Sequence, residues 1–128
     1  MASVFTEIRK GEIEGYILDD DGKFFAFLNH APAAFGHTLV VPYQEIDYIL
    51  DLDEDTYQAL WIYARKVAKR LQEITGKDRI GIMVKGFQVP HVHIHLIPVD
   101  AEVEMHGKID MSPQEKQEFI ERYQAIET

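Results

Sequence analysis

The stretch His91-Val92-His93-Ile94-His95-Leu96-Ile97-Pro98 decides how this chain is interpreted, because histidines alternate with apolar residues along it. In an extended strand, successive side chains point to opposite faces of the sheet. The three histidines therefore share one face, and Val92, Ile94 and Leu96 share the other. We expect a strand over residues 92–99 that carries a titratable row on one side and packs into a core on the other.

The histidine row favours chemistry over packing. Imidazole can act as nucleophile, proton donor and proton acceptor near neutral pH, because its unperturbed pKa is about 6.5. The alternative is a polar, solvent-exposed face of an edge strand. Three bulky rings in strict alternation, beside Gly86 and Pro90, are an unusual choice for such a surface. We therefore interpret the row as part of a catalytic or binding site.

Further strands are predicted upstream of this row. Apolar runs over residues 15–18 and 24–28 flank Asp19, Asp20, Asp21 and Gly22, which favour a solvated turn. Residues 36–42 form a run that is β-branched at its centre and closes at a proline. Residues 80–84 read as a fourth strand. With the histidine strand, these runs predict a sheet of about five strands.

Two helices are predicted as well. Between residues 53 and 75, apolar side chains recur at spacings of three and four, which indicates one long amphipathic helix. Ser112-Pro113-Gln114-Glu115 combines an N-cap serine, a proline at the first helical position and a glutamate at the third, so a second helix is expected over about 112–126. Strands with a single long helix among them favour an α+β sandwich over a doubly wound parallel sheet.

Composition restricts the class of protein. The 128 residues suit one domain, and 46% hydrophobic residues supply a core. No apolar run approaches the roughly 18 residues of a membrane span, and the N-terminus lacks a leader pattern, so we expect a soluble, cytoplasmic protein without a membrane partner. The net charge of −9 argues against a nucleic-acid partner. With no cysteine, disulfides and thiolate catalysis are excluded.

The histidine row and its flanks resemble the histidine triad (HIT) superfamily. Residues 91–97 match its alternating histidine and apolar signature. Phe27-Leu28-Asn29-His30-Ala31-Pro32 and Gly36-His37-Thr38-Leu39-Val40-Val41-Pro42 resemble the upstream segment of these proteins, and residues 5–13 resemble their N-terminus. The similarity covers about residues 4–99 in the same order. It implies an antiparallel HIT-like sheet with one long helix as the core, and residues 112–126 as a helical extension of a single domain over 1–128.

The resemblance also implies a mechanism. HIT proteins hydrolyse or transfer nucleotides at an α-phosphate, with the middle histidine as nucleophile, here His93. A backbone carbonyl fixes one of its ring nitrogens, so that the other can attack phosphorus. His95 is expected to bond a non-bridging phosphate oxygen, and His91 and His37 to shape the site. Backbone amides over 86–89 are expected to donate hydrogen bonds to the phosphate oxygens as negative charge develops on them, so no metal or other cofactor is needed.

The resemblance assigns nucleotide contacts. Asn29 falls where relatives place a residue that bonds the ribose hydroxyls, although it could also serve as a turn former. Gln88, with Val89 beside it, is expected near the leaving group, one position away from the usual glutamine. Phe87 and Trp61 are interpreted as packing residues, His30 as a loop residue at the pocket rim and His106 as an exposed residue. The candidates to sandwich a purine base are Phe5, Ile8, Phe27 and Leu28.

Two features depart from bacterial relatives. Many of these begin with Cys-x-x-Cys, which binds a structural zinc together with two histidines, but this chain has Ser3 and Thr6 at those places. The histidine that often follows the upstream proline is also missing, since Tyr43, Gln44 and Glu45 follow Pro42. We therefore expect that zinc to be absent.

Several alternatives stay open. The preferred substrate is a purine nucleoside monophosphate joined to an amine, as in an adenosine phosphoramidate, and the second choice is a dinucleoside polyphosphate. A metal-dependent hydrolase is less favoured, because His91 and His95 lie roughly 13 Å apart along a strand, too far to share one ion. A nucleotide-binding regulator without turnover is a third class. The resemblance further implies a homodimer, with Tyr57 and Trp61 as residues to examine at its interface or in the core.

Overall fold

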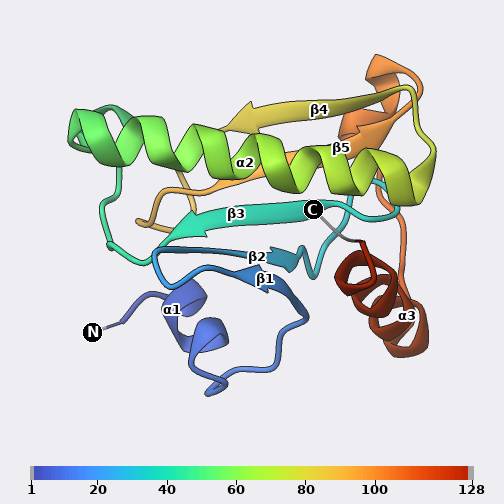
Figure 1. Ribbon diagram of the computed structural model, residues 1–128, viewed down its shortest axis with the longest axis horizontal. Helices are drawn as coiled ribbons and strands as arrows, with labels where there is room; N and C mark the ends of the chain where they lie inside the picture. Colours follow the sequence, from blue (N-terminus) through green and yellow to red (C-terminus); the bar gives the residue numbers. More distant parts are fainter. Residues whose placement is uncertain (1, 127–128) are drawn as a thin grey trace.

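A five-stranded antiparallel sheet in the order β1-β2-β3-β5-β4 forms the centre of the protein (Figure 1). The structure is a computed structural model, and it describes residues 2–126. The strands are β1 (Ile17–Asp20), β2 (Phe24–Leu28), β3 (Thr38–Pro42), β4 (Arg79–Val84) and β5 (Ile94–Val99). The helical elements are α1 (Val4–Arg9), η1 (Ile49–Asp51), α2 (Glu54–Thr75), η2 (Glu102–His106) and α3 (Pro113–Gln124). This confirms the predicted α+β fold.

The long helix α2 lies across one face of the sheet (Figure 1), which we call the helix face. The apolar stripe of α2 packs against α3 and against every second residue of the strands. The side chains from helices and strands together form one core, the helix-face cluster. Asp53 caps the start of α2 by accepting a hydrogen bond from the Thr56 amide, and Gly76 ends it at a φ of 67°. The helix-face cluster includes Leu60, Val67, Leu71, Val40, Val92, Ile94, Leu96, Phe119 and Tyr123.

The opposite side, which we call the histidine face, carries a second apolar cluster and the histidine row. Leu39 of β3 pairs with His95 of β5, so the two side chains stand beside each other. Phe5 of α1 contacts Phe27 at a ring separation of 5.6 Å and closes part of this face. As predicted, Val92, Ile94 and Leu96 point to the helix face, away from the histidines.

The elements begin and end close to the predicted limits, with three additions. The helical elements α1, η1 and η2 were not expected, because segments of three to six residues are too short for a clear apolar period. β5 begins at Ile94, so His93 lies just before the strand and His91 lies in the bend that leads to it. The helix α3 contributes Phe119 and Tyr123 to the main core. That residues 1–128 act as one domain stays a prediction.

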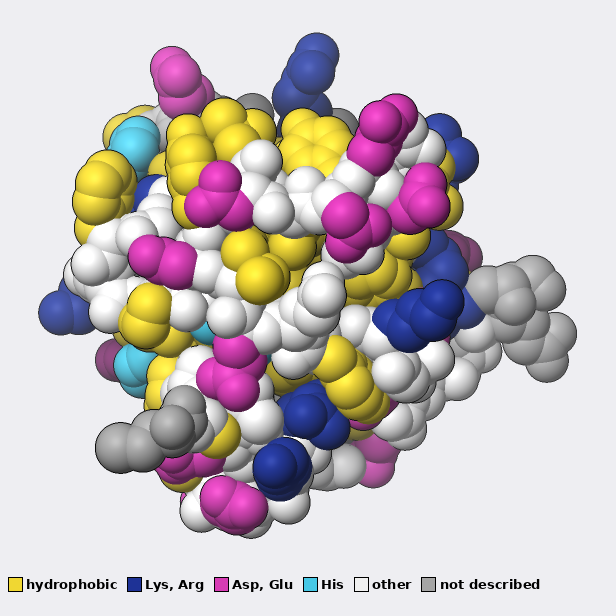
Figure 2. Space-filling view, turned by 90° about the vertical axis from the view of Figure 1, so that its left-hand side faces the viewer, with side chains coloured by type: hydrophobic (Ala, Val, Ile, Leu, Met, Phe, Trp, Pro, Cys, Tyr) yellow, Lys and Arg dark blue, Asp and Glu magenta, His cyan; other side chains and the backbone are white. Residues whose placement is uncertain are grey.

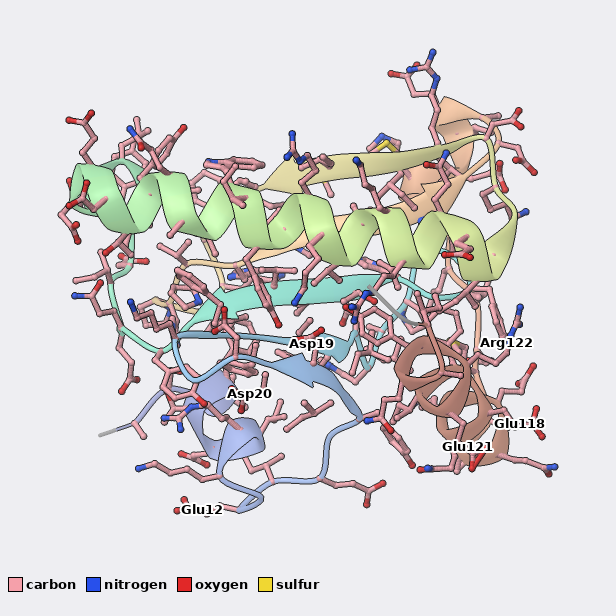
Figure 3. All side chains as sticks on the ribbon, viewed as in Figure 1. Glu12, Asp19, Asp20, Glu118, Glu121 and Arg122 are labelled. Atoms are coloured by element: carbon pink, nitrogen blue, oxygen red, sulfur yellow. The ribbon has the colours of Figure 1, made fainter. Side chains whose placement is uncertain are left out.

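The structure corrects the interpretation of Asp19 as part of a solvated turn. The ladder between β1 and β2 shifts register between Ile17 and Asp19, and such a bulge re-aims the bulged side chain. Asp19 therefore turns toward the helices (Figure 3), with its side chain only 12% exposed. Its carboxylate accepts hydrogen bonds from Tyr63 at 2.9 Å and Tyr123 at 3.0 Å, and pairs with Arg70 at 3.4 Å. Asp19 thus links β1 to α2 and α3.

The surface carries the excess of acidic residues. On the side shown in Figure 2, acidic side chains are spread widely, and apolar side chains reach the surface between them. Within residues 2–126, no helix is both long enough and apolar enough to cross a membrane.

Candidate active site

A cavity of about 700 Å³ opens on the histidine face, between α1, the end of β2, the start of β5 and η2. Among its lining residues there is one lysine, there are five histidines, and there is no aspartate or glutamate. In a chain of net charge −9, a lining with one lysine, no carboxylate and several imidazole groups favours an anionic ligand over a cationic one. The titratable lining residues are His30, His37, Lys85, His93, His95 and His106.

His93 is held in one tautomer. Its Nδ1 lies 2.8 Å from the carbonyl oxygen of His91, and a carbonyl can only accept, so Nδ1 carries the proton. In the neutral ring, Nε2 then has a free lone pair. The edge of the ring meets Phe5 at a centroid distance of 4.9 Å, which restricts its rotation. His93 lines the cavity and is 7% exposed, so a buried ring of fixed orientation, with one nitrogen free of a proton, borders the cavity.

His37 and His95 form a relay with fixed protons. The backbone N–H of Ala33 donates to Nδ1 of His37 at 2.9 Å, so the proton of neutral His37 is on Nε2. Nε2 lies 2.9 Å from Nδ1 of His95 and donates to it. The remaining nitrogen of His95, Nε2, must then carry its proton and can donate to a ligand oxygen. The Ala33 amide thus determines which nitrogen carries the proton in both His37 and His95.

His91 supports the site from behind. It is fully buried and does not line the cavity. Its Nε2 donates to the carbonyl oxygen of Pro42 at 2.7 Å, so Nδ1 is an acceptor and receives the hydroxyl proton of Ser3 at 2.5 Å. The ring is fixed on both sides, and its own carbonyl orients His93.

Burial lowers the pKa of the four hydrogen-bonded histidines described above, because a charged imidazolium loses its hydration. These are His37, His91, His93 and His95. The pKa of His37 falls to about 3, first through burial and then through the charges of His95 and Lys85. The pKa of His95 falls to about 4, again chiefly through burial. Burial also lowers the pKa of His91 and His93, against the opposing effect of their carbonyl partners. Near neutral pH the rings are therefore neutral, as a nucleophilic nitrogen requires.

The apolar end of the cavity contains most of the predicted base-binding residues. Phe5, Ile8 and Phe27 line it, and Val89 lies beside them. The structure corrects the expectation for Leu28: it is buried in the helix-face cluster and does not line the cavity, because alternation along β2 turns it away from Phe27.

Asn29 lies at the rim beside the relay. Its Oδ1 accepts a hydrogen bond from the Ala31 amide at 3.1 Å, which is the turn-forming role left open above. Its Nδ2 lies 3.3 Å from Nε2 of His37, but both nitrogens carry protons, so Nδ2 is left as a donor for a ligand. Asn29 can thus shape the turn and contact a ligand at once.

Several lining residues were not predicted. Lys85 follows β4: because Val84 pairs with Ile94, the next step of the antiparallel ladder sets Lys85 opposite His93 on the same face. Only a prediction of strand register could have found Lys85.

His106 of η2 also lines the cavity, which gives this exposed residue a place at the site. Phe87 is 96% exposed, so its interpretation as a packing residue was wrong, whereas Gln88 does lie at the cavity.

The residues at the zinc positions of relatives do not fit a structural zinc. Thr6 Oγ1 lies 3.4 Å from Ser3 Oγ, which in turn donates to His91. Neutral hydroxyls are not the ligands of such sites, which use thiolate, imidazole or carboxylate groups. Across residues 2–126, no group of three or more histidine, aspartate or glutamate side chains is placed to hold a metal ion.

Comparison with known proteins gives consistent matches. The family model described as HIT domain matches residues 10–102. An uncharacterised HIT-like protein of Saccharolobus solfataricus is 32% identical over 100 residues, 74% of this chain and 72% of the relative. The bis(5'-adenosyl)-triphosphatase of Dictyostelium discoideum is 33% identical over 79 residues, 58% of this chain and 53% of that protein. The crystal structure of a Hit-like protein from Bartonella henselae superposes with a TM-score of 0.85 at 26% identity, covering 96% of this chain and 94% of that one.

Proposed function

The chain belongs to the HIT domain family, a superfamily of nucleotide hydrolases and transferases, and from this premise we propose that it hydrolyses purine nucleoside monophosphate conjugates at the α-phosphate. One observation supports the proposal above all others. Nδ1 of His93 is bonded to the His91 carbonyl in a cavity without acidic side chains, which leaves Nε2 as a neutral nucleophile. The reaction then passes through a covalent nucleotidyl-histidine.

In the first step, Nε2 of His93 forms a bond to the α-phosphorus. The bond from phosphorus to the leaving group breaks, and the leaving group takes the bonding electron pair, together with a proton from solvent if it is an amine. Because Nδ1 already donates to the His91 carbonyl, the partial negative charge of that oxygen stabilises the positive charge that develops on the ring. His95 donates from Nε2 to a non-bridging phosphate oxygen. The hydrogen bonds from the Ala33 amide through His37 keep the proton of His95 on that nitrogen.

In the second step, water replaces the histidine. The water oxygen bonds to phosphorus, the phosphorus–nitrogen bond breaks, and its electron pair returns to Nε2. The water proton leaves to solvent, and the product is the nucleoside monophosphate. Two displacements replace one difficult displacement, which is the general advantage of a covalent intermediate. The burial that keeps His93 neutral also makes it ready for the next cycle.

The nucleoside is proposed to lie at the apolar end of the cavity. Phe5, Ile8 and Phe27 provide apolar and aromatic surface for a purine, and Nδ2 of Asn29 is a donor for a ribose hydroxyl. Val89 lies on the same side. The phosphate is then proposed to lie near the histidines, and the leaving group near Lys85 and Gln88, which also line the cavity.

Lys85 favours the second candidate substrate, a dinucleoside polyphosphate. A cation opposite the nucleophile can neutralise the charge on the further phosphates of a departing nucleotide, but it gains little from an amine. The relatives from Dictyostelium discoideum and Arabidopsis thaliana carry names that include bis(5'-adenosyl)-triphosphatase, and each covers 58% of this chain. The preferred substrate remains the phosphoramidate, and the two share the same nucleophile.

Turnover of an adenosine phosphoramidate and of diadenosine triphosphate, measured side by side without added metal, tests the proposal. We expect release of the nucleoside monophosphate from at least one of them, unaffected by EDTA. His93→Ala should abolish turnover and keep nucleotide affinity within about tenfold, because the binding contacts come from other residues. Equal loss of affinity and turnover, or silencing by EDTA, would contradict the nucleophilic role.

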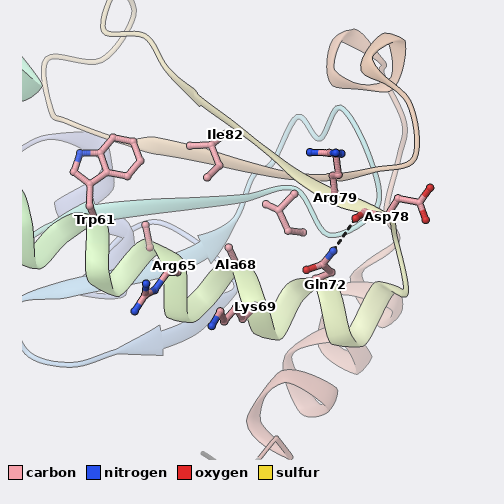
Figure 4. Close-up of a pocket in the computed structure, with 10 residues that line it drawn as sticks. Trp61, Arg65, Ala68, Lys69, Gln72, Asp78, Arg79 and Ile82 are labelled. Carbon is pink, nitrogen blue, oxygen red and sulfur yellow. Dashed lines mark hydrogen bonds between the residues drawn. The ribbon is translucent and has the colours of Figure 1, made fainter.

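We also propose that two chains pair through the groove between α2 and β4 (Figure 4), and that the dimer works in the cytoplasm. β4 is an edge of the described sheet, so it has a row of backbone groups free to pair with a second copy. The groove has an apolar floor that includes Trp61, Ala68 and Ile82, and Ile82 is 50% exposed. Ile62 on α2 is 60% exposed as well. Tyr57 packs on Trp61 at 6.3 Å and belongs to the core margin.

Sedimentation of the wild type and of Ile82→Glu tests the dimer. The wild type should sediment as a dimer at micromolar concentration, and the charged variant as a folded monomer, because a carboxylate cannot be buried unpaired in an apolar interface. A monomeric wild type would overturn the dimer and leave the reaction as proposed.

A further inference from the structure

We propose that Ser3 is a positioning residue of the reaction, held in place by Glu45, and that it couples the first helix to the nucleophile. The inference rests on the proposed function of His93. It concerns residues to which the resemblance assigns no role in this chain, because in relatives their places belong to zinc ligands. Here a path of hydrogen bonds runs from the N-terminal segment through His91 to His93.

The path can be followed atom by atom. The backbone N–H of Ser3 donates to the carboxylate of Glu45. The hydroxyl of Ser3 donates to Nδ1 of His91 at 2.5 Å, while Nε2 of His91 donates to the Pro42 carbonyl at 2.7 Å. The carbonyl of His91 accepts from Nδ1 of His93 at 2.8 Å. The donor and acceptor roles agree at every step, so the path admits one tautomer for each ring.

Ser3 has a second role that strengthens the first. Its hydroxyl oxygen accepts a hydrogen bond from the Thr6 amide at 3.2 Å, which caps α1, while its proton goes to His91. From the same helix, Phe5 contacts both His91 and His93, at ring distances of 5.8 and 4.9 Å. The helix α1 is therefore fastened to the two histidines by one hydroxyl and one aromatic ring.

Removing the hydroxyl has a specific consequence. His91 is 0% exposed, so its Nδ1 would lose its donor in a place that water does not reach. The ring can then tilt or exchange tautomers, and the carbonyl that holds His93 moves with the same residue. Misplacement of a nucleophile by about 1 Å can lower a rate about a hundredfold. Hydrogen bonds from Ser3 thus secure the segment that the resemblance would secure with a metal.

Kinetics of Ser3→Ala, Ser3→Thr and Ser112→Ala test the inference. Ser112 is a matched control: it caps α3 by accepting from the Glu115 amide, as Ser3 caps α1, but its side-chain hydrogen bond within the described residues stays in that cap. We expect Ser3→Ala to lower kcat about tenfold to a hundredfold with KM within about threefold. Ser3→Thr, which keeps the hydroxyl, should restore at least half of the lost rate on a logarithmic scale. Ser112→Ala should leave kcat within twofold.

A direct readout separates positioning from general loss of structure. Nitrogen NMR of histidine-labelled protein should show a single Nδ1-protonated tautomer for His93 in the wild type, and averaging between tautomers in Ser3→Ala. For the outer link, Glu45→Gln keeps an acceptor and should retain activity, whereas Glu45→Ala should lower kcat by a smaller factor than Ser3→Ala, because Glu45 is exposed.

The inference is overturned if folded Ser3→Ala keeps kcat within twofold of the wild type and the His93 tautomer is unchanged. It is also overturned if Ser112→Ala lowers kcat as much as Ser3→Ala does. Should Ser3→Ala not fold, Glu45→Ala against Glu45→Gln decides: equal rates refute the path. If the wild type shows no turnover of either substrate, the proposed function fails, and the NMR tautomers still test the path from Ser3 to His93.

Discussion

Lowering the pH from 7 to 5 should reduce the free energy of unfolding by about 4 kcal/mol through His37 and His95 alone. Both rings have pKa values lowered by burial, to about 3 and about 4. A group whose pKa is lower in the folded state binds protons first in the unfolded state. Stability from these rings is therefore complete above the unfolded pKa of about 6.5 and is lost as the pH falls toward 4 and 3.

The magnitude follows from the distance between pH 5 and the unfolded pKa. At pH 5 an unfolded imidazole is almost fully protonated, while both folded rings are still largely neutral. Each ring then contributes about 1.5 pH units at about 1.4 kcal/mol per unit, or about 2 kcal/mol. Since both folded values lie below 5, the result depends little on where they lie. His91 and His93, whose pKa values are lowered too, add to the loss.

Urea unfolding at pH 7 and pH 5, for the wild type, His37→Asn and Leu39→Ala, measures the effect. His37→Asn removes one titrating ring, so its loss between the two pH values should be smaller by about 2 kcal/mol. Leu39 is a matched control, because it is buried on the same face and pairs with His95 but does not titrate. Leu39→Ala should be less stable at both pH values with the same loss as the wild type. If His37→Asn shows the wild-type loss, His37 is not buried in the neutral form.

Three further predictions follow from named contacts. Asp19→Ala should lower the free energy of unfolding by about 3 kcal/mol, because it leaves two tyrosine hydroxyls and Arg70 without their shared partner; chemical denaturation checks this, and a loss below about 1 kcal/mol would contradict the anchoring role. Lys85→Ala should lower kcat/KM for diadenosine triphosphate about tenfold more than for an adenosine phosphoramidate, because only the former leaves with charged phosphates; equal effects in parallel assays would remove Lys85 from the leaving-group side. Phe5→Ala should weaken adenosine monophosphate binding about tenfold by calorimetry, since it removes aromatic surface from the cavity, and unchanged affinity would exclude Phe5 from the base site.

Much of the fold was predictable because its signals are local. The alternation in residues 91–97 fixed which side chains face the core, and the spacing over residues 53–75 fixed the long helix, since each pattern reflects one element alone. The serine and proline that start α3 were equally local. Short helical elements and the exact start of β5 escaped, because they depend on tertiary contacts and not on a repeating pattern.

The candidate site was predictable only in part, for a physical reason. Alternation and the family resemblance placed the histidines, but the partners that fix their protons come from distant segments: Ser3 lies 88 positions from His91, and Ala33 lies four positions from His37 in a turn. Lys85 needed the register of β4 against β5. Leu28 was misplaced, since an apolar strand such as β2, buried on both faces, does not show in its composition which side chains face the ligand.

The most direct test of the central claim is to trap the covalent intermediate. Protein quenched in acid-free denaturant during turnover of an adenosine phosphoramidate or of diadenosine triphosphate is digested, and the peptide that contains residues 91–95 is analysed by tandem mass spectrometry. We expect one nucleoside monophosphoryl group on His93, and none on the His93→Ala variant. A label on any other residue, or steady turnover by His93→Ala, would contradict it.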